Sequence, residues 1–232
     1  MLKIGMIGGL GPESTLDYYK LIIEMYRKEI DINSNPEIII NSLDIHRLLR
    51  FAASKEWDQL ARCLVDGIEA LDKAGADFAF ISANTPHIVF NQVQELSPIP
   101  LISIVEATCK KVLSIGIKKV GLLGTGFTMS NKFYQEVFGK YDIDIIVPSE
   151  IEQQYIHSKI FDELELGIFT DQTRTGLLGV IKRIVETEGI EGVILGCTEL
   201  PLILTDDSFG IPFINTTKEH VQSIISYCKT ER

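Results

Sequence analysis

Short apolar segments alternate with longer helical patterns along the whole 232-residue chain. The apolar segments are rich in Ile and Val, and both of their faces are apolar, as in strands that helices cover on each side. Alternation of this kind predicts parallel strands joined by crossover helices, and therefore an α/β fold. We expect the strands at residues 3–9, 37–43, 77–83, 100–104, 119–125, 144–149, 192–198 and 212–216.

Two sequence patterns each occur twice, with the copies about one hundred residues apart. Residues 3–19 and 119–134 both combine a strand, a glycine turn, hydroxyl side chains and a helix with a tyrosine; residues 75–87 likewise resemble 190–202. The repeats predict two pseudo-symmetric lobes, each a parallel sheet flanked by helices. Because ligands of α/β proteins bind at the carboxyl ends of strands, we expect the active site in the cleft between the lobes. The expected lobes are residues 1–98 plus 210–232 and residues 99–209.

The composition argues against several classes of function. A net charge of −10 is unsuited to nucleic-acid binding, which needs a basic surface. The four cysteines and four histidines are scattered, without the spacing of a metal site. Met1 leads directly into LKIGMIG, which reads neither as a signal peptide nor as a membrane span. We therefore expect a cytoplasmic protein with reduced thiols, no metal and no membrane partner.

Several groups that could bind an acidic ligand follow the predicted strands. In GGLGPEST (8–15), Gly11 precedes a proline that starts a helix, and free N–H groups at such a start attract carboxylates. The same stretch also fits a purely structural tight turn. Thr125 and Thr128 stand beside another helix start, where they could bind a ligand or only cap the helix. Arg47 could supply a cation to a diacid, or be simply solvated.

The third and seventh strands end in similar polar clusters. Asn84 and Thr85 follow Ala83, whereas Thr198 follows Cys197. Asn and Thr are suited to holding a ligand's oxygens or closing a turn. Cys197 could be a buried, space-filling residue, but its place before a helix start predicts a lowered thiol pKa and reactive chemistry. The other three cysteines lie in helical patterns and are read as buried.

Five ordered motifs, GGLGPEST, NTPH, LLGTGFTM, IFDELELG and LGCTELPL, resemble those of the aspartate/glutamate racemases that work without pyridoxal phosphate. The motifs span nearly the whole chain, and within the family they are most similar to bacterial broad-specificity amino-acid racemases. The resemblance implies two lobes, an amino dicarboxylic acid as substrate, no cofactor, and a homodimer. It also implies a set of substrate-binding residues: Leu10, Gly11, Asn84, Thr85, Thr125, Thr128 and Thr198.

The resemblance further implies two acid/base residues, one in each lobe, that exchange the α-proton on opposite faces of the substrate. Cys197 matches one of these positions, and Ala83 occupies the other, where a methyl group can transfer no proton. The alanine could be an engineered replacement, or natural in a slow or one-sided racemase that uses an ordered water. It could also mark a single-cysteine reaction such as that of arylmalonate decarboxylases. The alternative from another class is a non-catalytic protein that binds dicarboxylic amino acids.

Overall fold

The computed structural model describes residues 2–230, and the chain divides into two compact units. Unit 1 is Met1–Ala107 with Thr217–Arg232, and unit 2 is Thr108–Thr216. These boundaries lie further along the chain than the sequence predicted. The reason is strand pairing: β4 (Leu101–Ile102) pairs with β3 (Phe78–Ile81), and β8 (Phe213–Asn215) pairs with β7 (Gly192–Gly196). β4 therefore belongs to unit 1, although the expected boundary at residue 98 put it in the second lobe. β8 belongs to unit 2, although the expected boundary at residue 209 put it in the first lobe.

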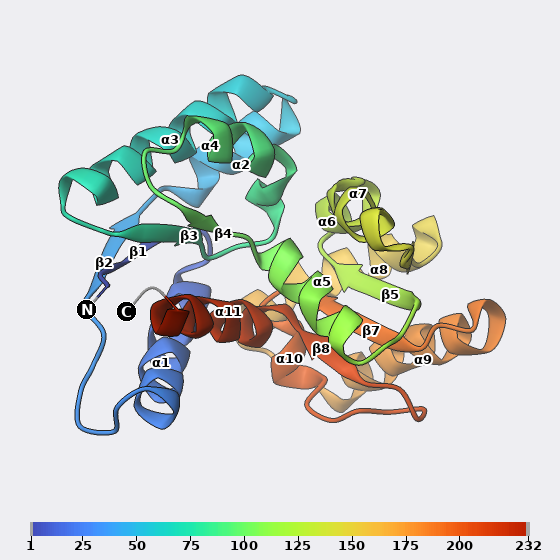
Figure 1. Ribbon diagram of the computed structural model, residues 1–232. Coiled ribbons are helices and arrows are strands. Elements are labelled where there is room, and N and C mark those ends of the chain that lie inside the picture. Colours follow the sequence, from blue (N-terminus) through green and yellow to red (C-terminus); the bar gives the residue numbers. More distant parts are fainter. Residues whose placement is uncertain (1, 231–232) are drawn as a thin grey trace. The chain divides into compact units, whose positions relative to one another are not determined.

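Unit 1 contains a parallel sheet with the strand order β2-β1-β3-β4. Figure 1 shows two helix layers around it, with α2, α3 and α4 on one face and α1 and α11 on the other. The remaining bounds are β1 (Ile4–Gly8), β2 (Ile38–Ser42), α1 (Pro12–Glu29), α2 (Ile45–Ala53), α3 (Trp57–Lys73), η1 (Thr85–Val89), α4 (Phe90–Leu96) and α11 (Thr216–Thr230). The last helix, α11, lies almost wholly in unit 1, the unit of the first strands.

Each face of the unit 1 sheet carries its own apolar core. On one face, Ile7 and Ile81 pack against residues of α3 such as Leu64. On the other face, Tyr18 of α1 and Ile224 of α11 pack against strand side chains. The sheet is apolar on both sides for this reason, as the run of Ile and Val predicted.

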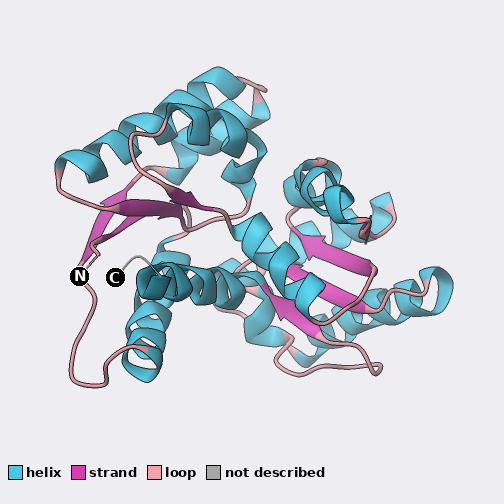
Figure 2. Ribbon diagram, in the orientation of Figure 1, coloured by secondary structure: helices cyan, strands magenta, loops and turns pink. Residues whose placement is uncertain are grey.

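Unit 2 repeats the same strand order, as β6-β5-β7-β8. All its strand pairs are parallel, and Figure 2 shows its strands flanked by helices, like those of unit 1. The bounds are α5 (Ile104–Ser114, shared with unit 1), β5 (Lys119–Gly124), α6 (Gly126–Ser130), α7 (Phe133–Phe138), η2 (Gly139–Tyr141), β6 (Asp144–Ile146), α8 (Glu150–Asp162), η3 (Leu164–Leu166), α9 (Asp171–Glu188) and α10 (Leu200–Ile203). The predicted internal repeat is thus visible in the topology.

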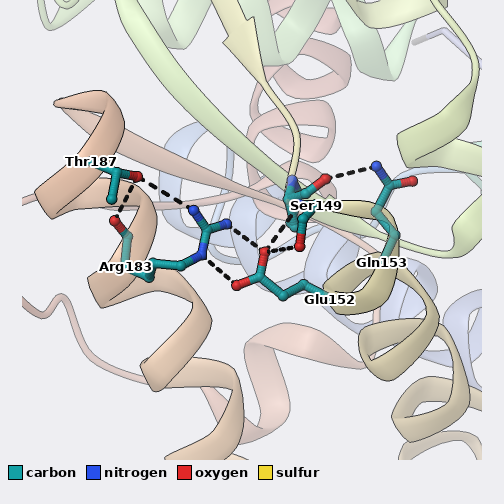
Figure 3. A network of polar contacts seen from close by, with 6 residues as sticks. Ser149, Glu152, Gln153, Arg183 and Thr187 are labelled. Atoms are coloured by element: carbon teal, nitrogen blue, oxygen red, sulfur yellow. Dashed lines mark hydrogen bonds and ion pairs between the residues drawn. The ribbon is translucent and has the colours of Figure 1, made fainter.

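A polar network fastens α8 to α9 in unit 2 (Figure 3). Glu152 receives two hydrogen bonds from the Arg183 guanidinium, and its Oε2 also accepts the Ser149 backbone N–H at 2.9 Å. Ser149 and Glu152 form a capping box, which satisfies free N–H groups at the start of α8. Arg183 lowers the pKa of the Glu152 carboxyl, so the pair stays ionised at neutral pH.

All eight predicted strands are confirmed, each one to three residues shorter at one or both ends than its apolar segment, and the α/β class with two four-stranded parallel sheets is confirmed with them. Among residues 2–230, no helix has the length and apolar character needed to span a bilayer.

Candidate functional site

In unit 1, the loop after β1 is shaped by two glycines with positive φ. Gly9 has φ +75°, and a Cβ there would lie 2.3 Å from the Leu43 carbonyl oxygen. The two backbone segments therefore lie too close together for a side chain at position 9. Gly11 has φ +116° and precedes the first residue of α1. The Thr15 hydroxyl accepts the Gly9 N–H at 2.9 Å and donates to the Gly11 carbonyl. The loop that carries Gly11 and the buried Leu10 is thus held from both ends.

Two serine hydroxyls join this loop to the end of β3. Ser14 Oγ donates to the Ser82 carbonyl at 2.8 Å, and Ser82 Oγ donates to the Ile7 carbonyl at 2.9 Å. Because β1 and β3 are adjacent and parallel, the residues that follow them lie at the same sheet edge. The structure therefore brings the first loop together with half-buried Ala83, buried Asn84 and Thr85, which starts η1.

His87 fixes the backbone of the β3 tip. Its Nδ1 donates to the Ala83 carbonyl at 2.9 Å, and its Nε2 accepts the Ile104 N–H at 3.3 Å. The ring is stacked on Phe90. Burial, with a smaller contribution from nearby His220, lowers the pKa of His87 to about 3, so the imidazole is neutral. Both ring nitrogens are used within the protein, which gives His87 a structural role.

Arg47 lies among a different set of side chains. It is exposed in the first turn of α2, with its guanidinium 5.7 Å from the ring centroid of Phe51. It lines a cavity of about 240 Å³ between α2 and α3 whose other lining residues include Arg62 and Asp66. The cavity contains no other predicted site residue, so the role of Arg47 toward a diacid stays a prediction.

In unit 2, the hydroxyl residues after β5 cap the short helix α6. Thr125 Oγ1 accepts the Thr128 N–H at 3.2 Å, and the two hydroxyl oxygens are also 3.2 Å apart. Thr128 is fully buried, and the Gly126 N–H donates to His157 Nδ1 at 3.3 Å. Capping is therefore a demonstrated role of these threonines, and substrate binding stays a prediction.

Cys197 follows β7 directly and is nearly buried, with 8% of its surface exposed. It is one of the buried residues of the unit 2 core, together with residues of α8 and α9, but its thiol also forms a hydrogen bond. Cys197 Sγ donates to Glu199 Oε2 at 2.8 Å, and the Thr198 hydroxyl donates to the same oxygen at 2.8 Å. A turn closed by the Leu200 N–H and the Cys197 carbonyl places all three side chains together.

The expected lowering of the Cys197 pKa is wrong: the pKa of this thiol is raised well above its ordinary value. Burial is the largest cause, and the negative charge of Glu199 is the next. The helix start that the sequence suggested is only the four-residue α10, so it cannot offset these effects. At neutral pH the thiol is protonated and can act first as an acid.

Two acidic residues of this site were missed by the sequence analysis. Glu199 stands two residues after Cys197 in LGCTELPL, and an acidic residue so near a candidate cysteine was a usable signal. Glu165 lies far away in sequence, so only the fold reveals that it acts on Cys197. Desolvation and repulsion from Glu199 raise the pKa of Glu165, even though its side chain still reaches solvent.

Ala83 and Cys197 hold equivalent positions in their units. Ile81 of β3 pairs with Ile7 of β1, and Leu195 of β7 pairs with Leu123 of β5. Each candidate residue comes two positions after that paired residue, at the carboxyl end of the third strand along its unit. The match in register supports the sequence repeat that first linked them.

For the part of the chain that the structure describes, no group of three or more His, Cys, Asp and Glu side chains is placed to hold a metal ion. The candidate groups are instead hydroxyls, amides, backbone N–H groups and one thiol. Such groups can bind carboxylates and transfer a proton.

Comparisons with known proteins agree on one family. A family model described as Asp/Glu/Hydantoin racemase matches residues 7–224. The broad specificity amino-acid racemase RacX of Bacillus subtilis (strain 168) is 25% identical over 228 residues, which are 96% of this chain and 96% of that protein. The structure of an aspartate racemase homologue from Pyrococcus horikoshii OT3 is 36% identical, with a TM-score of 0.87, and covers 99% of this chain and 100% of that chain.

A glutamate racemase from Francisella tularensis subsp. tularensis SCHU S4 shares the fold, with a TM-score of 0.71 at 17% identity over 99% of this chain and 82% of that one. The region matched by the family model takes in both units and the loops after β1, β3, β5 and β7. Several curated relatives, RacX and glutamate racemases among them, carry racemase names, and racemases are isomerases. Sequence motifs, fold and relatives therefore lead to the same conclusion: the chain belongs to the Asp/Glu/Hydantoin racemase family.

Proposed function

We propose that this chain racemises aspartate and/or glutamate without a cofactor, by removing and returning the proton of the α-carbon. Cys197 is the acid/base group on one face of that carbon. Ala83 takes the opposite position, where it can neither donate nor accept a proton. The activity is therefore impaired or confined to one face, and inversion needs a water or a displaced neighbouring group to transfer the proton on the other.

The observation that carries the proposal is the hydrogen-bonded thiol of Cys197 at the carboxyl end of β7. A buried thiol that keeps its proton can protonate a carbanion from one side. Ala83 holds the matching position after β3 of unit 1, and this correspondence supports its assignment as the counterpart of Cys197. A merely space-filling cysteine would need no acidic partner at 2.8 Å.

Cofactor-independent proton removal leaves negative charge on the substrate carboxylate, which fixed donors must stabilise. Hydroxyl, amide and backbone N–H groups at the two sheet edges can supply these donors. Arg47 is the proposed cation for the side-chain carboxylate. The proposed binding set is Leu10, Gly11, Arg47, Asn84, Thr85, Thr125, Thr128 and Thr198.

Solvent exchange tests the chemistry directly. In deuterium oxide, ¹H NMR follows loss of the α-proton signal from L- and D-aspartate and from both glutamate enantiomers, while chiral chromatography follows inversion. We expect exchange of one enantiomer to outpace inversion. Cys197→Ala should reduce exchange by a factor of about 10²–10⁴, the usual contribution of a positioned acid/base group. Cys228→Ala, which removes a buried thiol of α11 away from the proposed binding residues, should leave exchange intact.

Restoring a second group tests the role of Ala83. Ala83→Cys and Ala83→Thr should raise inversion by about 10²-fold or more, because each adds an exchangeable proton on the missing face. If the unchanged chain and both variants are equally inert toward exchange, the racemase proposal fails. Tight binding of aspartate without exchange in any variant would instead identify a binding protein.

The proposal also includes a cytoplasmic homodimer, as the family resemblance implies. Light scattering of the purified chain, whose monomer mass is 26.0 kDa, distinguishes a dimer from a monomer.

A further inference from the structure

We propose that Glu199 is a positioning residue for Cys197: its carboxylate holds the thiol as a hydrogen-bond donor, so that Cys197 enters the reaction as an acid. The inference rests on the proposed function, since it assigns a role within proton transfer at Cys197. It concerns only residues of unit 2.

The geometry is local and well defined. Glu199 Oε2 accepts both the Cys197 S–H and the Thr198 O–H, each at 2.8 Å. Two donors on one oxygen fix the rotamer of the carboxylate and of both donors. The carboxylate is half-buried, next to the buried Cys197, so bulk water competes weakly for the thiol. The S–H bond therefore has one defined direction in the resting site.

The charges around the thiol have the same sign. After burial, Glu199 contributes most to the raised pKa of Cys197, and Glu165 contributes further. Both residues are acidic, and Glu165 is itself subject to repulsion from Glu199. A thiolate formed beside these groups is destabilised, so the resting sulfur carries its proton.

The α-C–H bond breaks as its proton passes to a water on the face of Ala83, and the electron pair stays on the α-carbon. That pair then forms a new C–H bond with the Cys197 thiol proton, the S–H bond breaks, and its electron pair stays on sulfur as a thiolate. That thiolate lies beside the Glu199 carboxylate, which makes it a stronger base. It regains a proton either from solvent or from the α-carbon of a substrate bound in the opposite sense. No redox partner or other reactant is needed.

The arrangement makes the two directions of transfer unequal at neutral pH. Protonation of the carbanion uses the resting thiol, whereas abstraction first requires the thiolate. The abstracting direction should therefore rise with pH into the alkaline range. Removing the charge of Glu199 should move that rise to lower pH.

The test measures the thiol itself and does not depend on turnover. The full chain is alkylated with iodoacetamide over a range of pH, and peptide mass spectrometry follows Cys197 separately from the other cysteines. Ultraviolet absorbance of the thiolate, taken as the difference from Cys197→Ala, gives the same titration independently of reagent access. For Glu199→Gln we expect a pKa lower by at least one unit, seen as an alkylation rate at pH 8 about tenfold higher.

Two further variants separate charge from general disturbance. Glu165→Gln removes a more distant charge and should lower the Cys197 pKa by less than Glu199→Gln does. Thr198→Val removes the second hydrogen bond to Oε2 but keeps the Glu199 charge, so the Cys197 pKa should rise or stay unchanged. Equal titrations for the unchanged chain and Glu199→Gln overturn the inference, as does a lowered pKa in Thr198→Val. If Glu199→Gln does not fold, Glu165→Gln must still lower the Cys197 pKa and Thr198→Val must not lower it, or the inference fails.

Failure of this inference and failure of the proposed function give different results. If the chain exchanges no α-proton but Glu199→Gln shifts the Cys197 titration, the thiol arrangement stands and the racemase proposal falls. If exchange is present but its pH profile and the thiol titration are unmoved by Glu199→Gln, only the role of Glu199 falls.

Discussion

His220 predicts how unit 1 responds to acid. Its ring is fully buried, between the Tyr18 hydroxyl and the Ile102 carbonyl. The carbonyl can only accept, so Nε2 donates to Ile102 at 2.9 Å and Nδ1 accepts from Tyr18 at 2.8 Å. The rings of Phe80 and His87 face it edge-on. Protonating Nδ1 would turn it into a donor, so that the Tyr18 hydroxyl could no longer donate to it, and would bury a positive charge.

The magnitude follows from the pKa. Burial lowers the pKa of His220 from an ordinary 6.5 to about 4. Between these values the unfolded chain binds the proton and the folded one does not, so stability falls as the pH drops below 6.5. The slope is about 1.4 kcal/mol per pH unit, and the loss by pH 4 is about 3 kcal/mol. His87 adds a similar slope, and mutual repulsion keeps the two from charging together.

Urea denaturation at a series of pH values measures this effect. The single tryptophan, Trp57, lies in α3 and reports on unit 1, where both histidines lie. His220→Gln should have a lower free energy of unfolding than the unchanged chain at pH 7. Between pH 6 and 4.5, however, its free energy of unfolding should fall by about 1.4 kcal/mol less per pH unit than that of the unchanged chain. His46→Gln, which replaces an exposed histidine of the same unit, should keep the original slope. Equal slopes for the unchanged chain and His220→Gln would refute the reasoning.

Two other predictions concern stability alone. Gly9→Ala should destabilise unit 1 by several kcal/mol (of the order of 3), because its Cβ would meet the Leu43 carbonyl oxygen at a positive φ. Gly179→Ala, in a helix with open space around the new Cβ, is the matched control and should stabilise slightly in the same thermal denaturation assay. Glu152→Gln should lower the free energy of unfolding by about 1 kcal/mol, because it removes the ion pair with Arg183. The loss should be smaller at high salt, since that ion pair is partly exposed. A loss independent of salt would contradict that account.

The strands and their parallel arrangement could be predicted because each is a short Ile- and Val-rich run that must be covered on both sides. The lobe boundary could not, since β4 has only two residues and its partner is decided by pairing with β3 rather than by composition. The position of Cys197 at a strand end could be predicted from the sequence, but the direction in which its pKa is shifted could not. That direction depends on burial and on Glu165, which reaches the site only through the fold.

The backbone after β3 is held in place independently of the side chain at position 83. The contacts that hold this backbone run through the Ser82 and Ala83 carbonyls, to Ser14 and His87, and none of them uses the side chain at position 83. The side chain packs against the core of unit 1 but takes part in none of these hydrogen bonds, so a group of similar size, such as a hydroxyl or thiol side chain, would leave them in place. A substitution at position 83 would therefore change the group that this tip presents, while the hydrogen bonds that shape its backbone stay in place.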